Sequence, residues 1–145
     1  MIRDAFPSGN WLPEAMCKPN EQGYVRHVLH SDAADRYTIA ALVWRQGQHS
    51  PVHAHHTWCA LSVVEGALLE EYFDYDAQGA AAVPAGSACR NVGEGSSGTA
   101  GLHLIHRVGN SEARTAISVH VYGVATSRMS NGINHVLPVA ETAIA

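Results

Sequence analysis

Short apolar stretches separated by turn-forming residues dominate the chain from Tyr24 onward. Residues 35–45, "DRYTIAALVWR", alternate between polar and apolar positions and are rich in β-branched and aromatic side chains. Alternation predicts β-strands, because successive side chains of a strand point to opposite faces of its sheet. Similar strand-like stretches are "YVRHVL" at 24–29, "LHLIHRV" at 102–108 and "ARTAISVHVYGV" at 113–124. Several short strands and few helical patterns predict an all-β barrel or sandwich.

Turn-forming residues between these stretches predict how the strands are connected. "LSVVEGALLEEYFDY", residues 61–75, reads as two strands joined by a hairpin turn at Glu65 and Gly66. Pro84 within residues 81–92 predicts an edge strand or the start of a strand, since proline cannot donate to a sheet. "GEGSSGTAG", residues 93–101, reads as a loop. The first twenty residues form a predicted irregular lead-in with a short helical turn near 14–18.

Composition narrows the class of protein. The 145 residues are 46% hydrophobic and only 15% charged, which predicts a single folded domain over 1–145 with a core at about 24–125. A net charge of -4 disfavours nucleic acid and anionic membrane as partners, because both attract concentrated Lys and Arg. The N-terminus has no apolar segment of a signal peptide, and no apolar run is long enough to span a membrane, so we expect a cytoplasmic protein with reduced cysteines.

Four histidines gather in "HSPVHAHHTWC", residues 49–59. His53 and His55 lie two positions apart, so on a strand both side chains point to one face and can bind one ion. An HxH pair alone is a weak signal, and a polar histidine-rich turn is the competing interpretation. The surrounding spacing is more specific: Gly47, five residues, His53-Ala54-His55, three residues, Cys59, six residues and Gly66.

This spacing resembles the first metal-binding motif of cupin barrels, with Cys59 in place of the usual glutamate. "HRVGN", which contains His106 and Asn110, resembles the end of the second cupin motif, although the proline and glycine expected before it are missing. The predicted ligands are His53, His55 and His106. The competing histidines are His49, His56 and His103, of which the last two should face away from the ligands.

A centre of three histidines and no carboxylate restricts the chemistry. Fe(II) oxygenases normally use two histidines and one carboxylate with open positions, so a third neutral histidine suits a substrate that brings its own anion, such as a thiolate. Three histidines and a water molecule also suit catalytic zinc. The spacing alone does not separate the two metals.

The run "YVRHVL … LVWRQGQHSPVHAHHTWCALSVVEGALLEEYF … IHRVGN … AISVHVYG" resembles the cysteine dioxygenase family of thiol dioxygenases. The resemblance implies a cupin fold, the double-stranded β-helix or jelly-roll barrel, with one Fe(II) per chain bound by the three predicted ligands. Members of the family add both atoms of O₂ to a thiol and produce a sulfinate. This chain departs from the family at Ala54, which is usually aspartate, at "GVATS" after Tyr122, and in its shorter N-terminal segment.

The family's Ser-x-His-x-Tyr motif matches Ser118, His120 and Tyr122, which share one strand face. By resemblance, Ser118 orients His120, and His120 hydrogen-bonds the Tyr122 hydroxyl beside the iron. Arg26 matches the arginine that binds the substrate carboxylate in cysteine-selective members, where an arginine fork fits a carboxylate. Tyr24 matches a tyrosine that assists it. Glutamine is typical at this arginine position in members that act on 3-mercaptopropionate.

Cys59 matches a position at which some members of the family form a thioether to the active-site tyrosine, here Tyr122. The alternative is that Cys59 is a small buried hydrophobic residue beside the site. Trp58 and Leu61 are expected to keep the barrel mouth dry.

Together these features predict an Fe(II) dioxygenase that converts L-cysteine and O₂ into cysteine sulfinate, as a monomer or small homo-oligomer. Three alternatives stay open: a dioxygenase of another thiol acid, such as 3-mercaptopropionate or mercaptosuccinate, a metal-binding cupin without catalysis, and a zinc hydrolase.

Overall fold

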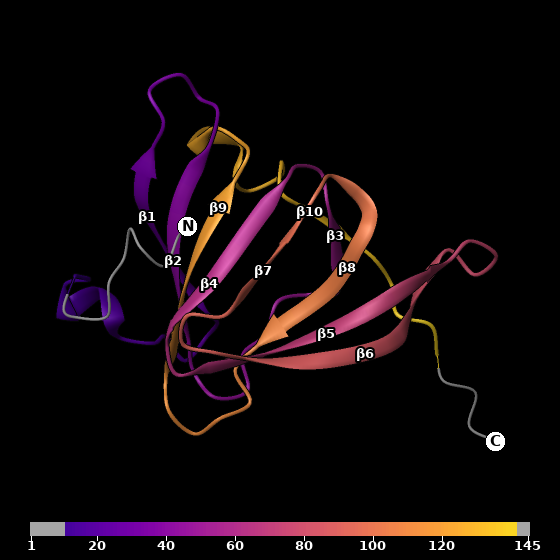
Figure 1. Cartoon of the computed structure of the whole chain (residues 1–145), viewed down its shortest axis with the longest axis horizontal. Coiled ribbons are helices and arrows are strands. Elements are labelled where there is room, and N and C mark those ends of the chain that lie inside the picture. The colour runs from indigo at the N-terminus through magenta and orange to yellow at the C-terminus, as the bar shows by residue number, and fades with distance from the viewer. Residues whose placement is uncertain (1–10, 142–145) are drawn as a thin grey trace.

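Two antiparallel sheets of five strands each make up the computed structural model, which describes residues 11–141 (Figure 1). The all-β prediction is therefore confirmed. The first sheet has the order β1 (Val25–Ser31), β2 (Thr38–Trp44), β9 (Ala116–Tyr122), β4 (Cys59–Glu65) and β7 (Gly95–Gly98). The second has the order β10 (Asn134–Val136), β3 (His53–His55), β8 (Gly101–Gly109), β5 (Ala67–Asp76) and β6 (Ala81–Asn91).

The two sheets face each other across the main core. Strand β2 lies inside the first sheet, and its alternate side chains therefore enter two different layers. Leu42 and Trp44 face the second sheet and pack in one cluster with Leu68 and Val108 from β5 and β8. The opposite face of β2 packs under the lead-in, where Leu12 is buried.

Helical structure in the described part of the chain is short. A 3₁₀ turn, η1 (Glu14–Cys17), coincides with the helical turn expected near 14–18. A second one, η2 (Thr126–Arg128), follows β9. No helix among residues 11–141 is long and apolar enough to cross a membrane.

Two local predictions were wrong. Glu65 and Gly66 do not form a hairpin, because β4 and β5 belong to different sheets. Gly66, with φ +70, is the corner at which the chain crosses over, and a Cβ there would lie 2.9 Å from the Thr115 carbonyl oxygen. The glycine- and serine-rich segment contains strand β7, which pairs with β4. Pro84 does lie in the edge strand β6, as predicted.

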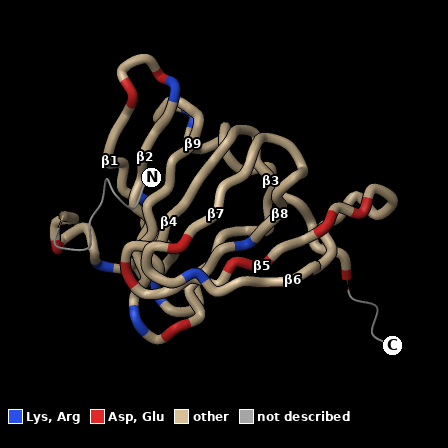
Figure 2. Tube along the Cα trace, in the orientation of Figure 1, with Lys and Arg blue, Asp and Glu red and all other residues tan. Residues whose placement is uncertain are grey.

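Charged residues are scattered over many elements of the fold. Figure 2 shows Lys and Arg singly on different strands and loops, interspersed with Asp and Glu, with no continuous basic stripe on the drawn trace. This distribution agrees with the small net charge of -4.

Candidate metal centre and its pocket

Two strands of the second sheet bring the three predicted histidine ligands together. His53 and His55 occupy both ends of β3, and β3 pairs with β8 so that His53 lies opposite His106. All three side chains are buried, and their ligand atoms lie within 4.8 Å of one another. Among the described residues, this is the group of metal-binding side chains that could hold one ion.

Hydrogen bonds at Nδ1 of two of these rings leave their Nε2 atoms free for a metal. His53 Nδ1 lies 2.8 Å from the Pro51 carbonyl oxygen, and His106 Nδ1 lies 2.7 Å from Glu70 Oε1. Both Nδ1 atoms must therefore be the protonated donors, and both Nε2 atoms keep a lone pair. His55 Nε2 and His106 Nε2 are 3.3 Å apart. Two nitrogens bound to one ion at about 2.1 Å are separated by about 3.0–3.4 Å, so the site fits a metal.

Burial keeps the imidazoles of His53 and His55 neutral, which is the form that binds metal. Desolvation, reinforced by the neighbouring histidines, lowers the pKa of His53 to about 4 and that of His55 to about 3. A cation in this position would not compete with a proton at neutral pH.

Glu70 on β5 holds the third ligand and was not anticipated from the sequence. Its carboxylate is completely buried, and it accepts four hydrogen bonds. Oε1 accepts from His106 and from Ser96 Oγ at 2.8 Å, and Oε2 accepts from Tyr72 at 2.8 Å and from Arg90 Nε at 2.9 Å. Burial alone would raise the pKa of Glu70, but the hydrogen bonds from His106, Ser96 and Tyr72 lower it to about 2.

A series of hydrogen-bonded polar side chains runs along β9. Trp44 Nε1 lies 2.9 Å from Ser118 Oγ, Ser118 Oγ lies 2.8 Å from His120 Nε2, and His120 Nδ1 lies 3.1 Å from the Tyr122 hydroxyl. The predicted grouping of Ser118, His120 and Tyr122 on one face is confirmed by these contacts. Trp44, from the neighbouring strand β2, is an additional member that sequence reasoning missed.

Trp44 fixes one end of this hydrogen-bonded series, because an indole N–H can only donate and Ser118 must accept from it. The Ser118 hydroxyl keeps its own proton, and donation of that proton to His120 Nε2 gives both buried groups a partner. Burial lowers the pKa of His120 to about 3, so its ring is neutral, and with Nε2 accepting from Ser118 its single N–H lies on Nδ1. That N–H donates to the Tyr122 oxygen. The Tyr122 proton is then free to donate into the pocket, and burial raises the pKa of Tyr122, which keeps the phenol protonated.

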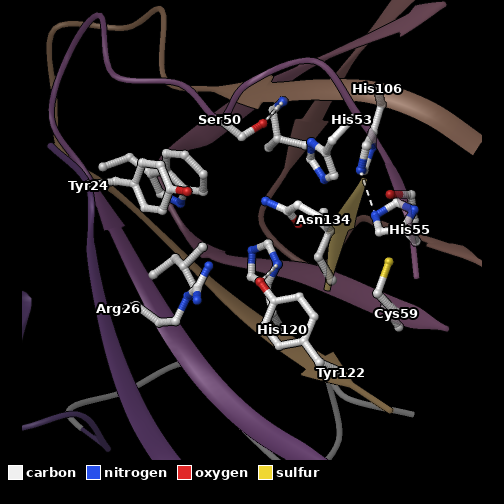
Figure 3. Close-up of a pocket in the computed structure, with 16 residues that line it drawn as sticks. Tyr24, Arg26, Ser50, His53, His55, Cys59, His106, His120, Tyr122 and Asn134 are labelled. Carbon is white, nitrogen blue, oxygen red and sulfur yellow. Dashed lines mark hydrogen bonds between the residues drawn. The ribbon is translucent and has the colours of Figure 1, made fainter. Parts of the chain in front are cut away.

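Arg26 and Tyr24 line the same pocket as the histidines, the first from β1 and the second from just before it (Figure 3). The Arg26 guanidinium carbon lies 5.6 Å from the centre of the Tyr122 ring. Arg26 Nε is buried without a protein hydrogen-bond partner. A buried donor without a partner is costly, so a ligand anion would be stabilised there. Tyr24 stacks on Trp44 with ring centres 4.5 Å apart.

Cys59 begins β4, directly opposite Tyr122 in the pairing of β4 with β9. It is buried and lines the pocket, and burial raises the pKa of its thiol to about 11. It does not belong to the cluster of possible metal ligands. The same site therefore holds Cys59 as a neutral thiol.

The remaining histidines do not join the cluster. His103 and His56 are exposed, as expected from their strand faces, and His56 stacks on His135. His49 Nδ1 contacts the carbonyl of Ser50. Asn110 is buried and donates to the carbonyls of Trp44 and Arg114, so its place in the motif is structural.

The pocket lining differs from the sequence-based expectation at Trp58 and Asn134. Trp58 is 46% exposed and does not line the pocket, whereas Leu61 does, so the expectation for Trp58 was wrong. Asn134 on β10 lines the pocket and lies opposite His55 in the pairing of β10 with β3. Figure 3 shows its side chain among the site residues. No motif singles out this asparagine, because it reaches the site only through the pairing of β10 with β3.

Solved structures similar to this chain share its fold. They include the Thermus thermophilus protein TT1209, with 17% identity over 77% of this chain and 92% of that one and a TM-score of 0.59. A Klebsiella pneumoniae protein with a double-stranded β-helix domain matches with 16% identity over 81% and 92% and a TM-score of 0.58. A cupin-superfamily sugar phosphate isomerase from Silicibacter pomeroyi matches with 21% identity over 70% of this chain and a TM-score of 0.55, and the match spans only 60% of that protein. These likenesses confirm the cupin fold.

Residues 7–130 match the family described as cysteine dioxygenase type I. The match includes both halves of the metal centre, the polar chain on β9 and the arginine on β1. The chain has a cupin fold with a three-histidine cluster that fits a metal. Because the family model also matches most of its length, the chain belongs to the cysteine dioxygenase type I family.

Proposed function

We propose that this protein is a non-haem Fe(II) thiol dioxygenase that converts L-cysteine and O₂ into cysteine sulfinate. The observation that supports the proposal most strongly is that a buried three-histidine cluster lies in one pocket with Arg26 and Tyr122. Iron bound by His53, His55 and His106 would supply the activation of O₂. The product gains both oxygen atoms on the sulfur, so no external reductant is needed.

The protein's own contribution is orientation and one proton donor. Arg26 binds the substrate carboxylate through its unpartnered Nε and its guanidinium fork, which fixes the thiol toward the histidines. Tyr24 packs beside it against Trp44. Tyr122 donates its hydroxyl proton as a hydrogen bond into the pocket, and His120 and Ser118 hold that hydroxyl in position.

Cys59 has a separate part in the proposal. It lies opposite Tyr122. Loss of the Cys59 thiol hydrogen and of one ring hydrogen of Tyr122, with O₂ as the two-electron oxidant, would join the two side chains by a thioether in the mature protein. Intact-protein mass spectrometry of the iron-loaded protein, before and after exposure to thiol and O₂, detects the two missing hydrogens. Cys59→Ser gives the matched sample in which no such loss should occur.

The decisive experiment is a substrate panel on iron-reconstituted protein. Oxygen uptake is measured with cysteine, 3-mercaptopropionate and mercaptosuccinate, and sulfinate is identified by mass spectrometry. Cysteine should give the highest kcat/KM. If another thiol acid is used as well or better, the cysteine assignment is wrong, and a lack of uptake with every thiol favours metal binding without catalysis. Stoichiometric zinc in protein purified without added metal would favour the hydrolase alternative.

Two variants test the assigned roles. His106→Ala should abolish iron retention, whereas His103→Ala, an exposed histidine three positions earlier on β8, should retain iron fully. Equal iron loss in both variants would show that the wrong histidine was assigned. Arg26→Gln should weaken the use of cysteine more than that of 3-mercaptopropionate, and an unchanged ratio of kcat/KM values would rule out Arg26 as the carboxylate-binding residue.

A further inference from the structure

The cluster of ligands lacks a carboxylate, yet a carboxylate lies one hydrogen bond away from it. Glu70 Oε1 is 2.7 Å from His106 Nδ1, on the side of the ring opposite the Nε2 that faces His55. Both groups are almost fully enclosed, with exposed fractions of 3% for the histidine and 0% for the glutamate. Water therefore cannot screen the charge of the carboxylate from the imidazole.

The other three donors fix that carboxylate in place. Arg90 and Tyr72 bind its Oε2, and Ser96 binds the same oxygen as His106. Arg90 also donates to the Tyr72 hydroxyl, so the two donors on Oε2 support each other. Four bonds fill the lone-pair positions of a carboxylate. The donors come from strands of both sheets, so the Glu70 carboxylate is held from both sides of the core.

The neighbouring Glu71 shows what a glutamate does on the other face of β5. It forms an ion pair with Arg107 at 2.6 Å, is partly exposed, and lies outside the ligand cluster. Adjacent residues of one strand thus carry the same carboxyl group into two environments. Burying a charge costs much more than leaving it at the surface, so the inner position requires an interaction that uses the charge.

We propose that Glu70 is the positioning residue of the metal centre: its buried carboxylate holds the His106 ring in the orientation and tautomer that bind metal, and supplies through that ring the negative charge that the three histidines lack. A hydrogen-bonded carboxylate makes imidazole a stronger electron donor, and loss of such a partner typically weakens metal binding by about 10–100-fold. The inference rests on the metal centre of the proposed function and not on the identity of its substrate.

The test compares Glu70→Gln, Arg90→Gln and Glu71→Gln. Fe(II) affinity is measured anaerobically by competition with a chromophoric chelator, in the absence of any thiol, and the midpoint potential of the bound iron is determined. Glu70→Gln should weaken Fe(II) binding about 10–100-fold and raise the potential, because less negative charge favours Fe(II) over Fe(III). Glu71→Gln should match the wild type in both.

Arg90→Gln separates the effect of the Glu70 charge from that of an intact hydrogen-bond network. It removes the cation that offsets Glu70 but leaves the bond to His106, so Fe(II) binding should equal or exceed that of the wild type. A purely structural role of the network predicts that Glu70→Gln and Arg90→Gln weaken binding alike, and that result would overturn the proposal, as would Glu70→Gln binding within threefold of the wild type. If Glu70→Gln does not fold, the double variant Glu70→Gln/Arg90→Gln, which leaves no unpaired buried charge, replaces it, with the same expected loss.

The outcome is independent of turnover. A protein that binds iron as described but oxidises no thiol would contradict the proposed function and leave the role of Glu70 intact. A protein that oxidises cysteine but binds Fe(II) equally well without the Glu70 charge would support the proposed function and contradict the role of Glu70.

Discussion

Replacing Ser118 with alanine should destabilise the metal-free protein by about 2–6 kcal/mol. Ser118 is fully buried and joins two polar groups, the Trp44 indole N–H at 2.9 Å and His120 Nε2 at 2.8 Å. Alanine removes one oxygen and leaves the backbone and Cβ in place, so little packing is lost. It leaves two buried groups without a partner, and each such group costs about 1–3 kcal/mol.

The double variant Trp44→Phe/Ser118→Ala measures the energetic coupling between Trp44 and Ser118. Trp44→Phe alone loses the indole N–H and some of the stacking on Tyr24, but Ser118 keeps its bond to His120. In Trp44→Phe/Ser118→Ala the unpartnered indole N–H no longer exists. The double variant should therefore be more stable than the sum of the single effects predicts, by about 1–2 kcal/mol.

The measurement is urea unfolding of chelator-treated protein at pH 8, followed by far-ultraviolet circular dichroism because Trp44 fluorescence changes in the variants. Ser62→Ala is the control, since Ser62 is also a buried serine of the first sheet but makes only a 3.5 Å contact to the Glu94 carbonyl. It should cost less than about 1 kcal/mol. Additive effects of Ser118→Ala and Trp44→Phe, to within about 0.5 kcal/mol, would refute the assignment of this cost to the Trp44–Ser118 hydrogen bond.

The remaining predictions concern pH and close backbone contacts. Because the folded-state pKa values of His53, His55 and His120 lie near 3–4, below the unfolded value, the metal-free protein should have its full stability above about pH 6.5. As the pH falls from about 6.5 toward 4, the free energy of unfolding should decrease by about 1.4 kcal/mol per pH unit for each histidine that stays neutral in the folded protein. Urea midpoints measure this decrease, and a flat profile would contradict the assigned burial. Gly95→Ala should cost about 3 kcal/mol or more, because its Cβ would lie 1.9 Å from a backbone oxygen of β4, whereas Gly86→Ala, with no atom within 4 Å, should be neutral. Equal thermal stability of these two glycine variants would show that β7 does not pair closely with β4.

Periodicity predicted those parts of the site in which one strand supplies several groups. His53 and His55 share a face of β3, and Ser118, His120 and Tyr122 share a face of β9, because alternation along a strand is a local rule. Spacing and family resemblance, not periodicity, connected His106 to His53 across the β3–β8 pairing.

The same rule could not find Glu70. In "LLEEYF" both faces of β5 read leucine, glutamate, aromatic, so alternation gives no sign of which glutamate is inside. Trp44 and Asn134 were missed for a related reason, because each reaches the site from a different strand through sheet pairing. The supposed hairpin at Gly66 failed because a turn signal does not tell whether the next strand pairs with the last one or crosses to the opposite sheet.

The strands that carry the site divide it between the two sheets. The histidines and Glu70 lie on β3, β8 and β5 of one sheet, whereas Arg26, the Ser118 chain and Cys59 lie on β1, β9 and β4 of the other. Under the proposed function, the ion would be held by one sheet and the substrate recognised mainly by the other. Substitutions on β1 could then change which thiol acid is used, while the strands that carry the three histidines stay unaltered.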